Sequence, residues 1–164
     1  METEQFSVRD DEQVVQMAGA LDAEARLQGE LRIYQHGDAQ ASITWLDGRQ
    51  EGPCVILHGP HRPMARTNYV AGRLHGPAEY FGPEGNLVRK TAYRHGLLHG
   101  VQSDYYADGT LFEQSTYRDG VLDGPWQRYH PNGARSERRT YAAGLPQGAA
   151  ERFDLAGAAI LKRG

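Results

Sequence analysis

A repeat of 24 residues is the sequence feature that most constrains this fold. Glycine recurs at Gly48, Gly72, Gly96, Gly120 and Gly144, and each is followed by a second glycine four residues later. A third glycine column and two aromatic columns keep the same period over most of the chain. A fixed period of this kind is typical of repeat proteins, in which each unit is one supersecondary element stacked on the next.

The glycine and aromatic columns are predicted to build the repeat. Burying most of an aromatic side chain contributes about 2 kcal/mol, so stacked rings can supply much of the stability of such a chain. We therefore expect each aromatic ring to pack on its equivalent in the neighbouring repeat, as part of the scaffold and not as a ligand cage. The residues assigned to this structural role are Gly72, Gly76, Phe81, Gly85, Tyr93, Gly96, Gly100, Tyr105, Gly109, Tyr117, Gly120, Gly124, Tyr129, Gly133 and Tyr141.

Turn residues separate short aromatic or β-branched segments throughout the repeat region. Asp119-Gly120 and Asn132-Gly133 are examples of the Asp-Gly and Asn-Gly pairs that tight hairpin turns favour. Neither face of a segment such as 111–117 is continuously apolar, and only 39% of the chain is hydrophobic. The predicted fold is therefore all-β: an elongated, single-layer antiparallel meander of tandem 24-residue β-hairpins.

Residues 1–28 fit the repeat less well than the rest of the chain. Val14, Met17, Ala18, Leu21 and Ala25 have helical spacing, whereas 13–17 is also compatible with a strand. We favour a degenerate first repeat or cap, with a helix as the alternative. The remaining chain is divided into tandem repeats over 29–157 and a C-terminal tail over 158–164.

The repeat unit resembles a known family. Its Gly-x-Leu-x-Gly segment from Gly96 to Gly100, the following Tyr105, the Asp108-Gly109 turn and the closing Tyr117 are similar to the MORN repeat. The resemblance is to the longer bacterial variant found in antitoxin components of toxin-antitoxin systems. It implies a protein-binding role, in which a long β-surface holds another protein, often a toxin or secreted effector encoded nearby. Membrane association has been proposed for some relatives.

Charge and composition favour some partners over others. A net charge of -3 supplies no general attraction to nucleic acid or to an anionic membrane. No basic, apolar leader begins the sequence, and no stretch approaches the roughly 18 apolar residues of a membrane span. We expect a cytoplasmic protein with neither a nucleic-acid partner nor membrane insertion. Cys54 is the single cysteine, which we interpret as a small, half-buried strand residue.

Catalytic and metal-binding chemistry is not expected from this sequence. His75 and His99 occupy one repeat position, so they should lie about 10 Å apart, too far to share a zinc ion. His95 and His99 flank one turn, but no third ligand accompanies them. The serines lie within strands, and nothing resembles a nucleophile elbow. We predict no catalytic residues, no cofactor and no metal.

Large amphipathic side chains that the repeat does not require are the candidates for partner binding. Trp126 aligns with Gln102 and Ala78, so the sheet itself does not need a tryptophan at this position. Strand alternation should place these candidates on the face opposite the Phe81 column. Trp, Tyr and Arg are also enriched in protein interfaces. The predicted partner-binding residues are Tyr80, Tyr106, Trp126, Arg128 and His130.

A basic run at Arg135, Arg138 and Arg139 allows two interpretations. It is a solvated strand face balanced by Glu137, which we favour, or a patch for phosphate or an acidic partner.

The functional hypothesis is a non-catalytic antitoxin or immunity protein that occludes a toxin or effector. The alternatives are a scaffold or effector chaperone, which would form a homodimer or bind a client through an unpaired sheet edge, and attachment to a membrane surface.

Overall fold

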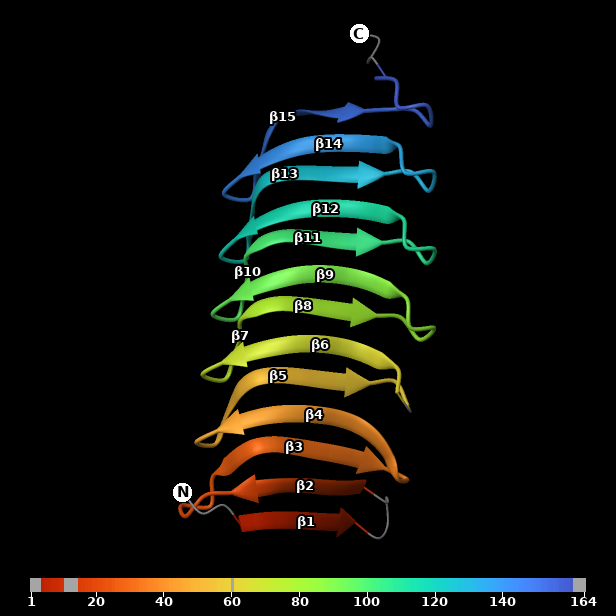
Figure 1. The fold of residues 1–164 in the computed structure, drawn as a ribbon. Coiled ribbons are helices and arrows are strands. Elements are labelled where there is room, and N and C mark those ends of the chain that lie inside the picture. Colours follow the sequence, from red (N-terminus) through yellow and green to blue (C-terminus); the bar gives the residue numbers. More distant parts are fainter. Residues whose placement is uncertain (1–3, 11–14, 60, 161–164) are drawn as a thin grey trace. The chain divides into compact units, whose positions relative to one another are not determined.

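The chain is all-β in the computed structural model, which describes residues 4–10, 15–59 and 61–160. Every described secondary-structure element is a strand, and within each unit the neighbouring strands of the sheet pair antiparallel as predicted (Figure 1). The chain divides into two compact units, residues 1–85 and 86–164, which are described separately below.

The first unit is a meander of hairpins. Strands β1, β2, β3, β4, β5, β6 and β8 are neighbours in that order, and the short β7 pairs with β6. Their bounds are β1 Glu4–Asp10, β2 Val15–Leu21, β3 Leu27–Gln35, β4 Asp38–Leu46, β5 Arg49–Leu57, β6 Pro63–Val70, β7 Arg73–Leu74 and β8 Gly76–Phe81.

The second unit continues the same construction. Strands β9, β11, β12, β13, β14 and β15 follow one another, and the short β10 pairs with β9. Their bounds are β9 Leu87–Arg94, β10 Leu97–Leu98, β11 Gly100–Tyr105, β12 Leu111–Arg118, β13 Val121–Tyr129, β14 Arg135–Ala142 and β15 Leu145–Arg152.

The N-terminal segment forms a hairpin of two strands, so the helical alternative is wrong, and its interpretation as a degenerate repeat stays a prediction. β1 and β2 pair in register from Glu4 opposite Leu21 to Asp10 opposite Val15. The connection at 11–14, which includes Val14 of the proposed helical pattern, lies outside the described residues. Pairing with β3 explains why this segment is a strand and not a helix. As a strand, β2 has a second hydrogen-bonded neighbour, which a helix would not have.

The loop between β2 and β3 is organised by one buried carboxylate. Asp22 is 6% exposed and accepts hydrogen bonds from the Glu24 and Arg26 backbone N–H groups at 3.0 and 2.8 Å. The Arg26 side chain and Gln28 donate to its other oxygen at 2.8 and 3.2 Å. Burial raises the pKa of Asp22, but these hydrogen bonds outweigh burial and hold the pKa below its ordinary value.

The connections between hairpins are two-residue turns that need a left-handed backbone. At Asp119 and Gly120, φ is +50° and +85°, the combination that a type I′ turn requires. In the second unit, the opposite end of each hairpin uses a longer loop. In the loop after β11, the Gly109 N–H donates to the Tyr106 carbonyl at 3.0 Å, and the Thr110 N–H donates to the Asp108 carboxylate at 2.9 Å.

Bulges interrupt the simple strand alternation expected from the sequence. Between β11 and β12, Asp104 pairs with Glu113 while Tyr105 pairs with Leu111, so Phe112 is an extra residue. Side chains on either side of a bulge therefore change face relative to strict alternation. Leu111 shares the face of Tyr105, and Glu113 shares the opposite face with Asp104.

Buried polar side chains lie in the middle of the strands of the second unit. Gln102, Ser115 and Trp126 are directly paired across β11, β12 and β13, and we call their side the Trp126 face. The opposite side, which carries Gln127 and Tyr129, is the Tyr129 face. Gln102 is 8% and Ser115 is 2% exposed, although every described element of the unit is part of the sheet. Side chains in the middle of these strands are thus buried although no described element forms a second layer in this unit, and few of the described residues are fully buried, as predicted.

The aromatic columns pack differently from the expected ring-on-ring ladders. Tyr93 pairs with Leu98 and Tyr117 pairs with Leu122, so leucines alternate with the tyrosines of this column. Equivalent residues of successive repeats are two strands, about 10 Å, apart, whereas ring pairs need centroids within about 7 Å. Arginine covers the Phe81 ring, with the Arg66 guanidinium carbon 5.1 Å from its centroid.

Candidate functional site: an aromatic and arginine cluster on the Trp126 face

Two strands, β12 and β13, and the loop after β11 bring an aromatic and cationic cluster together on the Trp126 face. The Arg128 guanidinium carbon lies 5.0 Å from the Trp126 ring centroid and 5.5 Å from that of Phe112. Tyr106 contacts Phe112 edge to face, with 5.1 Å between centroids and an interplanar angle of 71°. We call these four residues, Tyr106, Phe112, Trp126 and Arg128, the aromatic cluster.

Arg128 is held in place by a carboxylate as well as by the rings. Glu113 is its direct cross-strand partner, and the Glu113 Oε2 atom accepts hydrogen bonds from Nη2 at 2.9 Å and Nε at 3.2 Å. The Arg128 side chain remains 44% exposed, so the ion pair itself contributes at most about 1 kcal/mol. Its main consequence is that the guanidinium plane is oriented before any partner arrives.

Charged side chains extend this site across the unit. Arg89 Nε lies 2.6 Å from Asp104 Oδ1, and Arg139 Nε lies 3.4 Å from Glu137 Oε1. Asp104, Glu113, Arg128 and Glu137 are consecutive partners in the cross-strand register. The Trp126 face therefore presents a band of mixed charge beside the aromatic rings, which suits recognition of a polar protein surface.

The predicted partner-binding residues are divided between the two units. Trp126 and Arg128 are in contact, and Tyr106 joins them through Phe112. Tyr80 is a half-buried residue of β8 in the first unit, where it pairs with Ala65. Its participation stays a prediction.

Tyr106 and His130 also have a structural role that the repeat pattern does not reveal. The Tyr106 hydroxyl donates to the Tyr129 carbonyl at 2.9 Å, and His130 Nε2 lies 3.1 Å from the Phe153 carbonyl. The two residues are equivalent in successive repeats, and each bridges its loop to the backbone 23 residues further on. Polar side chains at this loop position thus connect successive repeats.

Phe112 is the cluster residue that the sequence pattern does not identify. Strict alternation assigns it to the side of Gln114, away from Arg128, but the bulge brings it under the guanidinium. The residue type does not mark this position as a bulge in the sequence. The equivalent residues in the neighbouring repeats, Val88 and Ser136, are of different types from Phe112 and from each other.

His99, one of the histidines considered for metal binding, lies near a charged turn residue. His99 Nδ1 is 3.4 Å from Asp119 Oδ1, the same oxygen that Arg94 contacts at 2.7 Å. The hydrogen bond from Arg94 holds the pKa of Asp119 below its ordinary value. In the part of the chain that the structure describes, no three His, Cys, Asp or Glu residues are grouped so that they could hold a metal ion. No described helix is long and apolar enough to cross a membrane.

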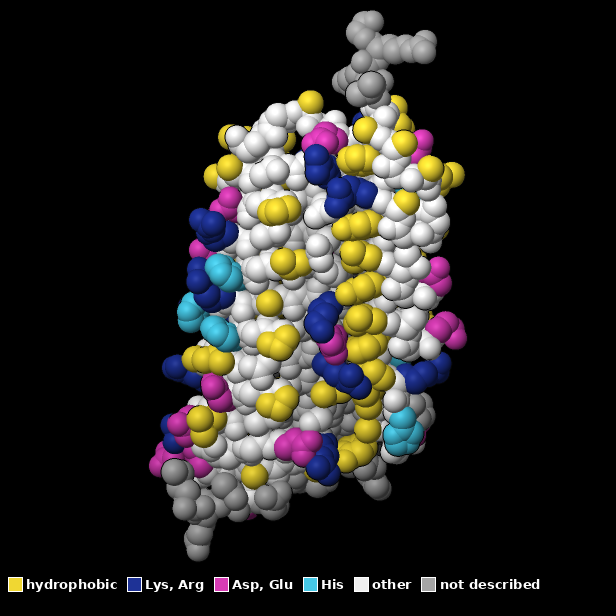
Figure 2. Space-filling view, turned by 45° about the horizontal axis from the view of Figure 1, so that its top comes forward, with side chains coloured by type: hydrophobic (Ala, Val, Ile, Leu, Met, Phe, Trp, Pro, Cys, Tyr) yellow, Lys and Arg dark blue, Asp and Glu magenta, His cyan; other side chains and the backbone are white. Residues whose placement is uncertain are grey.

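Hydrophobic side chains also reach the surface outside the aromatic cluster. Figure 2 shows one face of the molecule, on which hydrophobic side chains reach the surface and Lys and Arg are intermingled with Asp and Glu. The exposed hydrophobic residues of the second unit include Val101 at 50% and Leu145 at 68%. Val101 lies on the Tyr129 face, because it precedes Gln102 on β11.

Comparisons with known proteins support the repeat assignment. The model of the family described as MORN repeat variant matches residues 98–119 and 122–142. These two segments contain all four residues of the aromatic cluster. No match was found among curated proteins.

Solved structures offer only a distant likeness. The crystal structure of TarM matches 87% of this chain and 20% of its own length, with a TM-score of 0.34 and 9% identity. An S. aureus TarM mutant in complex with Fondaparinux, alpha-GlcNAc-glycerol and UDP matches 68% of this chain and 19% of its own, with a TM-score of 0.28 and 9% identity. The chain thus spans about a fifth of these proteins, and the likeness supports no functional argument. The firmer result is that residues 98–142 are similar to MORN repeats of the variant type, as their glycine and aromatic columns indicate.

Proposed function

We propose that this chain is a non-catalytic protein-binding repeat protein that acts in the cytoplasm as an antitoxin or immunity protein. The aromatic cluster is the observation that carries the proposal. MORN repeats generally bind proteins or membranes, and the cluster lies within the two matched segments. Its Trp, Tyr and Arg side chains are the types that dominate binding energy in protein interfaces.

A pre-ordered surface suits inhibition by occlusion. Arg128 is already oriented by Glu113 and two rings, so little side-chain entropy remains to be lost when a partner binds. The backbone around it is paired on both sides, because β13 has β12 and β14 as neighbours. Blocking a toxin requires only a complementary surface, typically about 800 Å² per partner.

Co-expression with the products of neighbouring genes tests the proposal. We expect one neighbour to be toxic alone and harmless in a stable one-to-one complex with this chain. Trp126→Ala should weaken that complex by about 2 kcal/mol, roughly 30-fold, and Arg128→Gln should weaken it in the same direction. Val101→Ala, an exposed change on the Tyr129 face, is the matched control and should leave affinity unchanged.

The outcome is interpretable only for folded variants, so circular dichroism and thermal unfolding accompany each affinity measurement. If a toxic neighbour forms the complex and neither cluster variant weakens it, the cluster is not the binding surface. If no neighbour is toxic and no complex forms, the antitoxin assignment fails.

The edge of the second unit favours a second candidate, a scaffold that associates through its sheet. β15 pairs with β14 on one side, and its residues are almost all exposed. Residues 153–160 fold back only at its end, where the Ile160 N–H donates to the Arg152 carbonyl at 2.8 Å. An edge strand of this kind can accept a further strand. Sedimentation at increasing concentration would detect self-association, and a monomer throughout would exclude the homodimer.

A further inference from the structure

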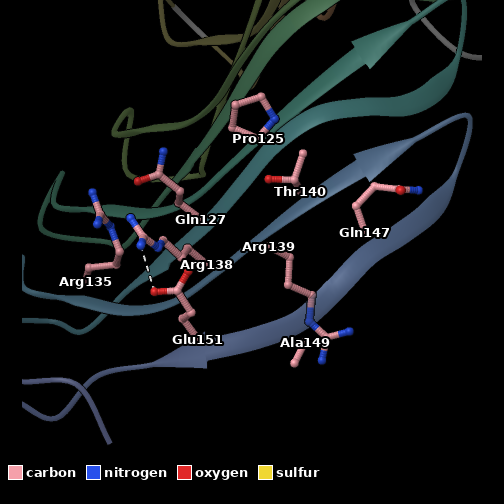
Figure 3. A pocket seen from close by; sticks show the side chains of 9 residues that line it. All are labelled: Pro125, Gln127, Arg135, Arg138, Arg139, Thr140, Gln147, Ala149 and Glu151. Atoms are coloured by element: carbon pink, nitrogen blue, oxygen red, sulfur yellow. Dashed lines mark hydrogen bonds and ion pairs between the residues drawn. The ribbon is translucent and has the colours of Figure 1, made fainter.

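A hollow on the Tyr129 face gathers basic side chains at the C-terminal end of the second unit. It has a volume of about 410 Å³ and lies on β13, β14 and β15 (Figure 3). The residues around it are Pro125, Gln127, Arg135, Arg138, Arg139, Thr140, Gln147, Ala149 and Glu151.

Two guanidinium groups share one aromatic ring in this region. The guanidinium carbons of Arg135 and Arg138 lie 5.8 and 5.9 Å from the centroid of Phe153. Arg138 is neutralised by Glu151, with 2.7 Å between Nη2 and Oε2, as the dashed line in Figure 3 marks. Arg139 pairs with Glu137, which belongs to the Trp126 face.

Arg135 has no hydrogen-bonded counter-charge of its own. The nearby Glu151 is hydrogen-bonded to Arg138, and the pKa of Glu151 is lowered by that bond and also by the charge of Arg135. The Arg135 side chain makes no hydrogen bond or ion pair with any residue that the structure describes, and its Nε atom is buried without an acceptor. A shielded N–H without an acceptor is unfavourable, and a nearby second guanidinium adds like-charge repulsion. One added carboxylate offsets the second of these costs, the repulsion between the two guanidinium groups.

We propose that this hollow binds an acidic segment of a protein, with a Glu or Asp carboxylate on Arg135. The fork of a guanidinium matches a carboxylate geometrically. The Gln127, Thr140 and Gln147 side chains supply donors and acceptors for the backbone of the same segment. With Arg138 already paired to Glu151, the net charge of Arg135, Arg138 and Glu151 is +1, which suits a single carboxylate better than a phosphate dianion.

This site is separate from the aromatic cluster. Gln127 follows Trp126 and precedes Arg128 on β13, and alternation directs its side chain to the other face. A partner bound to the aromatic cluster and an acidic segment in the hollow would therefore occupy opposite sides of one sheet.

Titration of the full chain with an acetylated tetra-glutamate peptide, followed by NMR, tests the proposal. We expect saturable shifts at residues around the hollow, weakened by added salt. Arg135→Gln should reduce the peptide affinity about tenfold, and Arg135→Lys should restore part of it because the charge returns without the fork. Arg73→Gln removes the same charge from an exposed strand of the first unit and should leave the affinity unchanged.

Three outcomes would overturn the site. The first is that the peptide binds Arg135→Gln as tightly as the unmodified chain, and the second is that a tetra-lysine peptide binds equally well. The third is that inorganic phosphate alone binds as tightly and displaces the peptide. Trp126→Ala serves as the independent arm. The affinity of this variant for tetra-glutamate should be unchanged, because Trp126 lies on the other face. A result that contradicts the acidic-peptide site can therefore be told apart from a result that contradicts the aromatic cluster as the partner-binding surface.

Discussion

Gly124 and Gly133 provide a matched pair for testing what the repeat glycines do. Both lie in the second unit, and both have positive φ, +130° and +81° respectively. A Cβ atom on Gly124 would lie 3.0 Å from Thr116 Cβ and 3.1 Å from Thr116 Cγ2, whereas one on Gly133 would meet no atom within 4 Å. Gly124 is therefore required both by its positive φ and by the close approach of Thr116, whereas Gly133 is required only by its positive φ.

Substitution by alanine separates these contributions. Gly133→Ala carries the left-handed backbone penalty, about 1–2 kcal/mol. Gly124→Ala carries a backbone penalty of similar or larger size. It also introduces contacts shorter than the 3.5–4.0 Å optimum for carbon pairs, and overpacking of this kind costs about 1–3 kcal/mol. We expect Gly124→Ala to be the more destabilising by about 2 kcal/mol.

Urea unfolding of the two variants, followed by circular dichroism, measures the difference directly. In a thermal scan it corresponds to roughly 4–8 °C in the melting temperature of a chain of this size. Thr116→Ala in the Gly124→Ala background removes one of the two close carbons and should recover part of the loss. The steric reasoning is refuted if Gly124→Ala is no less stable than Gly133→Ala.

Three further outcomes follow from individual contacts. Tyr106→Phe should lower the free energy of unfolding by about 1 kcal/mol because it removes the donor to the Tyr129 carbonyl, while Tyr105→Phe should have little effect. Because the pKa of Asp22 is lowered in the fold, its stabilising contribution is present above the unfolded pKa of about 3.9 and is lost as pH falls through the lower folded pKa. Below about pH 4, the free energy of unfolding of Asp22→Asn should therefore fall less steeply with decreasing pH than that of the unmodified chain. The Cys54 thiol, buried and with its pKa raised by burial, should react slowly with a thiol reagent until urea unfolds the chain; rapid labelling of the folded protein would contradict this burial.

The face that carries the candidate site is predictable from the sequence, but the composition of the site is not. Trp126 and Arg128 are on the face opposite that of Tyr129, a member of the Phe81 column. Alternation along a single strand is a local property, so the sequence predicts it. Phe112 and the loop bridge of Tyr106 each depend on an atom in another strand or repeat, so no local pattern announces them. The basic run likewise gives no indication that Arg138 is hydrogen-bonded to a carboxylate and that, among the described residues, the Nε atom of Arg135 has no acceptor.

The sequence by itself determined the hairpin period, the turn positions and the all-β class. These features follow from local chemistry: Asp119-Gly120 adopts positive φ at little cost, and the same turn returns every 24 residues. The tertiary structure alone decided where bulges reset the alternation, which side chains are buried in the middle of the bent strands, and which charges find partners. Those outcomes depend on register and on distances between strands, and a cross-strand distance cannot be obtained from the spacing of residues along one chain.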